Sequence, residues 1–307
     1  MPAIKDMLRI LIFSFFLLAF SAYNSTAQVG KTDREKAGLV GPVRSVTSSS
    51  ADFTGDKIEG KGYSIKPPET VSYDEVGNVL EEQMVSDFGE QMGKTVKKFD
   101  LELRLVENIW FDPKGKVVRK NVYVYDGGRL TESRTSDDKN VIREKTVYVY
   151  DDKARLTEEV YYDPTKPVAK TVYTYDRTGS RPSEYAFFLS DGRKAIAPVG
   201  PCLGAHRIKS TYDEKGRTLT QDVFDDDGSL KKGYRWTYDD RSNIASYISK
   251  TRSSTVTFTY SYEFDAQGNW IKRTAKATTD VEGLDVFGEP ATPYVRTTIT
   301  SRKITYF

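Results

Sequence analysis

The feature of this sequence that most constrains its fold is a short phrase that recurs at a nearly fixed spacing. An aromatic residue is followed by Asp, two variable residues and Gly, as in Tyr73-Asp74…Gly77 and Tyr212-Asp213…Gly216. The repeat anchors are Tyr73, Phe99, Tyr125, Tyr150, Tyr175, Tyr212, Tyr238 and Phe264, spaced 25 or 26 residues apart except for one step of 37. A fixed period of this size is typical of a repeat architecture, in which each unit packs on its neighbours.

The Asp-x-x-Gly part of the phrase has the chemistry of a tight turn. Asp accepts hydrogen bonds from the backbone amides that follow it, and Gly adopts the left-handed conformation at little cost. Weaker copies at half the period, such as Phe111-Asp112…Gly115 and Phe224-Asp225…Gly228, supply a second turn in each repeat. Turns at this spacing leave strands of about eight residues, which predicts tandem β-hairpins.

Between the turns the residues alternate. In Val122-Tyr123-Val124-Tyr125 and Val147-Tyr148-Val149-Tyr150, tyrosines occupy one face and valines the other. Period two over β-branched and aromatic residues is a strand signal. We therefore predict an all-β fold, an antiparallel meander of β-hairpin repeats that forms an extended, curled sheet.

The repeat array is expected to begin and end with strands and to be interrupted by two irregular segments. The first strand is expected at residues 43–48, and the last two at 295–299 and 303–307. The long step contains an insertion near 195–206 that is rich in Pro and Gly and is expected to be a loop. A second irregular segment is expected at 279–293, within one repeat domain that covers residues 39–307.

The first 27 residues have the layout of a secretory signal peptide. Lys5 and Arg9 precede an apolar stretch, and small residues follow, so we expect cleavage after Ala27 and a polar leader at residues 28–38. The predicted location is periplasmic or extracellular. An uncleaved membrane anchor is the alternative, but the apolar stretch is short for a transmembrane span.

The net charge bears on which partners the protein attracts, and the cysteine count bears on what stabilises the fold. The formal net charge is +2, which gives no broad field for attracting nucleic acid. Cys202 is the sole cysteine, so the chain has no internal disulfide. Strand pairing and packing must therefore stabilise the fold.

The Tyr-Asp-x-x-Gly-x-Leu phrase resembles the YD repeats of the RHS family of bacterial secreted and surface proteins. Two further stretches, 41–46 and 262–273, together with the last residues 302–307, are similar to small exported proteins that carry a few such repeats. The resemblance implies an exported repeat sheet. The seven or eight repeats here are too few to wind the cargo-enclosing shell of the large family members.

The sequence offers little catalytic or metal-binding chemistry. His206 is the single histidine, and it lies four residues after Cys202 in the insertion, where we expect both side chains to be dispensable. Two such residues cannot form a four-ligand zinc site. Asp225-Asp226-Asp227-Gly228 lacks the spaced ligands of a calcium loop and is interpreted as a turn. No cofactor motif is present, whereas a pair of catalytic carboxylates leaves no spacing signal and stays open.

The aromatic face is the candidate binding surface. Its residues are Tyr123, Tyr125, Tyr148, Tyr150, Tyr173, Tyr175, Trp236, Tyr238 and Tyr262. Such rings either pack against one another as part of a thin core or form a platform on which sugars or a partner protein stack. Trp110 and Trp270 are further anchors for such a platform.

Three functional hypotheses follow. The first is a non-enzymatic exported scaffold or binding surface at the cell envelope, with carbohydrate or another envelope protein as partner. The second is a polysaccharide-active enzyme with a carboxylate pair. The third, from the resemblance alone, is an accessory partner of a secretion or toxin system.

Overall fold

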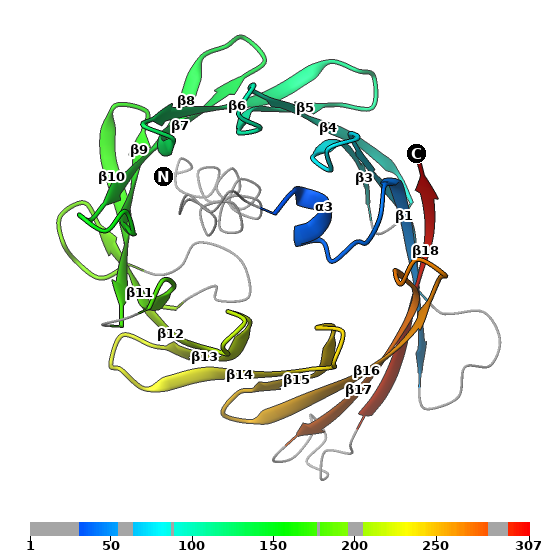
Figure 1. Cartoon of the computed structure of the whole chain (residues 1–307). Coiled ribbons are helices and arrows are strands. Elements are labelled where there is room, and N and C mark those ends of the chain that lie inside the picture. Colours follow the sequence, from blue (N-terminus) through cyan, green and yellow to red (C-terminus); the bar gives the residue numbers. More distant parts are fainter. Residues whose placement is uncertain (1–30, 55–63, 87–88, 177–178, 196–204, 282–293) are drawn as a thin grey trace. The chain divides into compact units, whose positions relative to one another are not determined.

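The computed structural model describes residues 31–54, 64–86, 89–176, 179–195, 205–281 and 294–307, which form eighteen antiparallel strands and one short helix, α3 (Asp33–Lys36) (Figure 1). The strands are β1 (Val43–Thr54), β2 (Ser64–Tyr73), β3 (Val79–Val85), β4 (Gln91–Phe99), β5 (Leu105–Phe111), β6 (Val117–Asp126), β7 (Arg129–Asp137), β8 (Ile142–Tyr150), β9 (Leu156–Asp163), β10 (Lys166–Tyr175), β11 (Pro182–Leu189), β12 (Arg207–Tyr212), β13 (Thr218–Phe224), β14 (Leu230–Tyr238), β15 (Ile244–Lys250), β16 (Ser254–Phe264), β17 (Trp270–Val281) and β18 (Tyr294–Tyr306). They form one meandering sheet, so the all-β antiparallel prediction is confirmed.

The predicted Asp-x-x-Gly turns are present. At Asp213 the carbonyl accepts the N–H of Gly216 at 2.9 Å, and the side-chain Oδ1 accepts the N–H of Arg217 at 2.8 Å. Gly216 and Gly268 have φ of +74° and +88°, the left-handed region that glycine adopts most easily. The expected turn at 176–179 has its Asp176–Gly179 backbone hydrogen bond, but residues 177–178 lie outside the described part of the chain.

Some turns keep this geometry without glycine. Leu103, Asn140, Ala154 and Ser242 have φ between +60° and +68°, and each lies three residues after an Asp whose carbonyl accepts its N–H. The aspartate is therefore the constant element of the turn.

Tyr73, Phe99, Tyr150, Tyr175, Tyr212 and Phe264 each follow an irregularity in strand register. The register shifts between Val149 and Tyr150, between Thr211 and Tyr212, and between Glu263 and Phe264. A turn followed by a left-handed residue and a bulge is the usual connection of three- to five-residue hairpins. The repeat phrase thus encodes both the turn and the bulge beside it.

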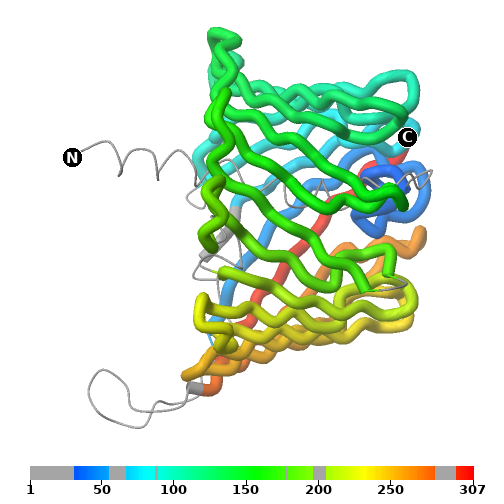
Figure 2. Tube along the Cα trace, turned by 90° about the vertical axis from the view of Figure 1, so that its left-hand side faces the viewer, coloured from blue at the N-terminus to red at the C-terminus, as the bar shows by residue number. Residues whose placement is uncertain are grey.

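The first and last strands pair with each other. Ser48 of β1 lies opposite Glu69 of β2 on one side and opposite Arg302 of β18 on the other. Figures 1 and 2 show β1 in blue beside β18 in red. The expectation of an extended sheet is therefore wrong, because the sheet closes between its two end strands. This pairing satisfies backbone N–H and C=O groups that free edges leave unpaired.

Both ends of the repeat array differ from expectation in detail. β18 is one strand of 13 residues where two were expected, and its pairing with β1 stays in register from Ser45 to Thr54. β1 likewise continues to Thr54 rather than ending at Ser48. Of the expected irregular segment at 279–293, residues 279–281 belong to β17, and 282–293 lie outside the described residues, as do 196–204 of the insertion.

Part of the expected polar leader is the helix α3. Thr32 caps it, because the Thr32 Oγ1 accepts the N–H of Glu35 at 3.2 Å and Glu35 Oε2 accepts the N–H of Thr32 at 2.7 Å. The N–H of Arg34 donates to the carbonyl of Gly77 at 2.8 Å. The helix is thereby fixed to the turn between β2 and β3.

A small hydrophobic core lies beside this junction. It consists of Leu39, Val43, Val46, Tyr73 and Val79, with Val71, Ile304 and Tyr306 packed against it. It joins the segment before β1 to strands β1, β2, β3 and β18.

Asn269 fixes the same junction by hydrogen bonds. Its Oδ1 accepts the N–H of Val40 at 2.7 Å, and its Nδ2 donates to the Val40 carbonyl at 2.8 Å and to the Tyr306 hydroxyl at 2.9 Å. The side chain is 1% exposed. One asparagine thus connects the chain before β1, the turn before β17 and the end of β18.

The chain divides into two compact units. Unit 1 contains Tyr123–Arg134 and Ile142–Arg235, and unit 2 contains Gly30–Val122, Thr135–Val141 and Trp236–Phe307. The closing pair β1–β18, α3 and the small core all belong to unit 2.

Candidate functional site

Three anchor tyrosines of unit 1 bind the strand that precedes their own. The hydroxyls of Tyr150, Tyr175 and Tyr212 donate to the carbonyls of Leu130, Leu156 and Pro182, at 2.8, 2.8 and 3.1 Å. Each acceptor lies at the start of the strand that follows the preceding turn. These anchor tyrosines of unit 1 therefore have a structural role, which applies to Tyr150 and Tyr175 of the predicted binding face.

An arginine in the preceding turn covers several of these rings. Arg155 Cζ lies 4.6 Å from the ring centroid of Tyr175, and Arg181 Cζ lies 5.6 Å from that of Tyr212. Arg155 also pairs with Asp151 of its own turn at 2.8 Å. Burial raises the pKa of Tyr175 to about 12, although Arg155 opposes the shift. These cation–π contacts add to the connection between neighbouring repeats.

Two further members of the predicted face are buried. Tyr123 and Tyr148 are 8% and 6% exposed, and the hydroxyls of Tyr148 and Ser133 share a hydrogen bond of 3.3 Å. Burial raises the pKa of the Tyr148 hydroxyl far above its ordinary value. Neither ring offers a face to a ligand, and the alternation of tyrosine and valine cannot distinguish this arrangement from an exposed platform.

A buried carboxyl group lies among the tyrosines of unit 1. Glu159 of β9 is 7% exposed, its Oε2 accepts the Tyr161 hydroxyl at 2.6 Å, and its Oε1 has no hydrogen-bond partner. Burial raises the pKa of Glu159, and the nearby hydroxyls of Tyr161 and Tyr173 oppose the shift. The group is therefore suited to the protonated form, which carries its own donor.

The Glu159 carboxyl group interacts with tyrosine hydroxyls. The side chains that shift its pKa are the two tyrosines, not a second carboxyl group. The next residue, Glu158, alternates to the other face and binds Lys170 at 2.8 Å.

The aromatic residues of unit 2 form a different arrangement. Trp236, Tyr247 and Phe258 follow one another across β14, β15 and β16, with ring centroids 5.3 and 5.5 Å apart, and Tyr260 stacks 6.4 Å beyond Phe258. All four side chains are partly exposed. We call this set the aromatic run.

The run continues toward Trp270. The rings of Tyr262 and Trp270 meet edge to face at 6.1 Å, and the Tyr262 hydroxyl donates to the Ile244 carbonyl at 2.9 Å. Arg302 Cζ lies 3.4 Å from the Trp270 ring centroid, and Arg273 Cζ lies 5.4 Å from it. Trp270 was expected as an anchor of the aromatic platform. Arg273, Arg302, Tyr247 and Phe258 were not in the predicted face, because none of them belongs to the repeated phrase.

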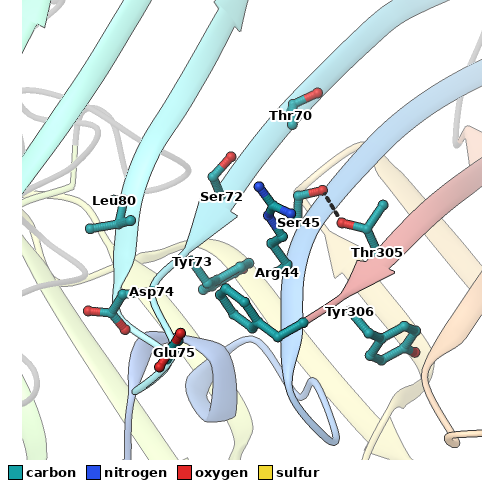
Figure 3. A pocket seen from close by; sticks show the side chains of 11 residues that line it. Arg44, Ser45, Thr70, Ser72, Tyr73, Asp74, Glu75, Leu80, Thr305 and Tyr306 are labelled. Atoms are coloured by element: carbon teal, nitrogen blue, oxygen red, sulfur yellow. Dashed lines mark hydrogen bonds between the residues drawn. The ribbon is translucent and has the colours of Figure 1, made fainter.

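An open hollow lies beside the closing strands of unit 2 (Figure 3). Arg44, Tyr73, Asp74 and Glu75 line part of it, and the dashed bond in Figure 3 joins Ser45 to Thr305 across β1 and β18. Burial raises the pKa of Tyr73 to about 12. The hollow has both charge signs on its walls.

The face opposite the aromatic residues carries ion pairs between neighbouring strands. They are Lys94–Glu81, Lys98–Glu107, Lys120–Glu107, Lys170–Glu158, Arg235–Asp222 and Lys272–Glu263. Such pairs suit a surface in contact with water. Within the described residues, no helix is long and apolar enough to cross a membrane.

The remaining candidates from the sequence contribute no site. Cys202 lies outside the described residues, so the structure does not test the Cys202–His206 pair. The described part of the chain holds no cluster of three or more metal-ligating side chains. Asp225 closes a turn on Gly228, as predicted, and pairs with Lys231 at 3.2 Å. Tyr125 and Tyr238 are partly buried on β6 and β14.

Comparisons with known proteins give only distant matches. No family model and no curated protein matches the chain. Among solved structures, a porin-like protein from Bacteroides uniformis is 12% identical, with 87% of this chain and 99% of that chain covered and a TM-score of 0.39. A Photorhabdus luminescens Tc holotoxin pore is 12% identical over 74% of this chain, which spans 15% of that protein, with a TM-score of 0.32. Because both TM-scores are below 0.5, neither match carries an argument about this protein.

Proposed function

We propose that this protein is an exported, non-enzymatic repeat scaffold that binds carbohydrate at the bacterial cell envelope or outside the cell. The single observation that carries the proposal is the aromatic run of unit 2, Trp236, Tyr247, Phe258 and Tyr260. Its rings are spaced 5.3 to 6.4 Å apart and stay partly exposed, whereas Tyr123 and Tyr148 of unit 1 are buried. Flat rings with polar handles suit stacking on sugar rings.

The anchor tyrosines of unit 1 and the aromatic run of unit 2 differ in what they contact, and this difference supports the proposal. The anchor tyrosines of unit 1 bind backbone carbonyls of the preceding repeat and are occupied by the fold. The aromatic run is in excess of what the repeat phrase requires, because Trp236, Tyr247 and Phe258 are not anchors. Residues beyond the needs of the repeat are candidates for recognition.

The predicted export of the chain is consistent with a role at the cell envelope. The basic, apolar and small residues of the first 27 positions support a signal peptide. The ion pairs on the other face of the sheet keep that face in water. The enzymatic alternative has less support, since the side chains that interact with the buried Glu159 are tyrosines. A role beside a secretion or toxin system rests on the YD-repeat resemblance alone.

A binding experiment with matched variants tests the proposal. Purified chain starting at Gln28 is incubated with immobilised envelope glycans, and captured protein is quantified for wild type, Tyr247→Ala and Thr259→Ala. Tyr247 is the central ring of the run, and Thr259 is an exposed residue beside Phe258 on the other face of β16. We expect Tyr247→Ala to weaken capture roughly three- to tenfold and Thr259→Ala to leave it unchanged. Equal capture of all three proteins contradicts the aromatic run as the binding surface.

A further inference from the structure

Two arginines and a tryptophan converge at the end of the aromatic run. Tyr262 of β16 lies opposite Arg273 of β17, which lies opposite Thr300 of β18. Cross-strand partners share a face, and Arg302 lies two residues beyond Thr300 on that face. Arg302 and Arg273 both lie against the ring of Trp270, with Cζ atoms 3.4 and 5.4 Å from its centroid.

Neither guanidinium has an acidic partner among the described residues. Arg273 donates one long hydrogen bond to Thr300 Oγ1, at 3.4 Å, and the Nε atoms of Arg273 and Arg302 are buried without any hydrogen-bond acceptor. Other arginines of the chain differ: Arg104, Arg155 and Arg217 each bind the aspartate of their own turn.

The electrostatic state of the pair is unfavourable in the absence of an anion. Burial, followed by repulsion from Arg273, lowers the pKa of Arg302 to about 10. Two like charges with partial desolvation and no counter-charge destabilise the fold that holds them. An anionic group beside the two guanidinium groups reduces this repulsion and accepts hydrogen bonds from them.

We propose that Arg273, Arg302 and Trp270 bind the carboxylate-bearing ring of an acidic sugar. The inference rests on the proposed carbohydrate-binding function and names the class of sugar. Guanidinium groups match a carboxylate by paired N–H donors, and the exposed part of the Trp270 ring offers apolar area to the sugar. The hydroxyls of Ser50 and Thr300, 3.0 Å apart, add polar groups on the neighbouring strands.

Calorimetric titration tests the proposal with three probes: a galacturonate oligosaccharide, a neutral glucose oligosaccharide of equal length and inorganic phosphate. The proteins are wild type, Arg302→Gln, Arg273→Gln and Lys303→Gln. Lys303 is exposed on the other face of β18, so its variant controls for the loss of one positive charge. Thermal unfolding of each variant confirms that it folds.

The acidic oligosaccharide is expected to bind more tightly than the neutral one. Arg302→Gln and Arg273→Gln are expected to weaken its binding at least about tenfold, and Lys303→Gln less than about twofold. Equal affinity for acidic and neutral sugars, or unchanged binding by both arginine variants, overturns the acidic-sugar site while the carbohydrate function stands. Binding of phosphate without either sugar overturns the sugar assignment, and binding of none of the three overturns this site. Failure of the glycan capture experiment with Tyr247→Ala is a separate outcome that concerns the aromatic run.

Discussion

At the residue scale, the buried Glu159 makes stability depend on pH. Its pKa in the folded state is raised by burial above the value in the unfolded chain. The folded state therefore holds the proton more tightly, and stability falls as pH rises above the ordinary glutamate pKa of about 4.3. Below that pH, Glu159 is protonated in both the folded and the unfolded state, so the cost of burying its ionised form is absent.

Glu159→Gln is expected to remove this penalty while retaining the bond from Tyr161. The free energy of unfolding at pH 8 should rise on the order of 1–3 kcal/mol relative to wild type, and at pH 4 the two proteins should differ little. Urea unfolding at the two pH values measures the difference. Glu158→Gln, which alters the partly exposed partner of Lys170, serves as control. A variant that is less stable than wild type at pH 8 contradicts a protonated Glu159.

The turn residues without glycine provide a second test at this scale. Leu103 has φ of +61°, which an L side chain adopts with strain. Leu103→Gly is expected to stabilise the protein by roughly 0.5–1 kcal/mol, the relief of strain less the added freedom of the unfolded chain. Leu101→Gly, in the same turn and fully exposed, is expected to be neutral or destabilising. In thermal melts, Leu103→Gly should raise the melting temperature, whereas Leu101→Gly should leave it unchanged or lower it.

At the element scale, the repeats are held together by the hydroxyls of the anchor tyrosines. Tyr175 of β10 reaches back to Leu156 at the start of β9, and Tyr150 of β8 makes the same bond to Leu130 at the start of β7. The bond crosses from one repeat to the previous one. Because β9 and β10 pair with each other, the Tyr175 bond lies across the open end of the hairpin that these two strands form.

Tyr175→Phe isolates this bond because it leaves the ring in place. We expect the free energy of unfolding to fall by about 1–2 kcal/mol, since the Leu156 carbonyl loses its side-chain donor. Thr174→Ala, an exposed position on the other face of β10, controls for strand propensity. Unfolding curves for Tyr175→Phe that overlay those of wild type rule out the tyrosine bond as a stabilising connection.

At the scale of the whole molecule, closure of the sheet depends on the junction around Asn269. Asn269→Ala removes two hydrogen bonds to Val40 and one to Tyr306 from a buried site. A loss of roughly 2–4 kcal/mol is expected, because the Val40 backbone groups are left without these partners. Gln267→Ala, exposed in the same turn, should have little effect. If Asn269→Ala melts with wild type, the junction does not hold the ends of the sheet.

Local features, the turns and strands, can be predicted from the sequence, whereas contacts between residues far apart in the chain cannot. The turns at Asp213 and Asp265 follow from Asp and Gly at a fixed spacing, and the strands follow from alternation. The pairing of β1 with β18 joins residues some 250 positions apart, and no local pattern encodes it. Burial of Tyr148 and exposure of Tyr247 also depend on which rings meet in space. Arg273 and Arg302 are two among 46 basic residues, so the contact of both with the ring of Trp270 could not be predicted.

The most direct test of the functional account is amide hydrogen exchange of the whole protein with and without a galacturonate oligosaccharide. If the sugar binds as proposed, exchange slows in β16, β17 and β18, around Tyr260, Arg273 and Arg302. It does not change in β8, β9 and β10, where the tyrosines bind other parts of the fold. Slower exchange confined to β8–β10, or no change anywhere at saturating sugar, contradicts the proposal.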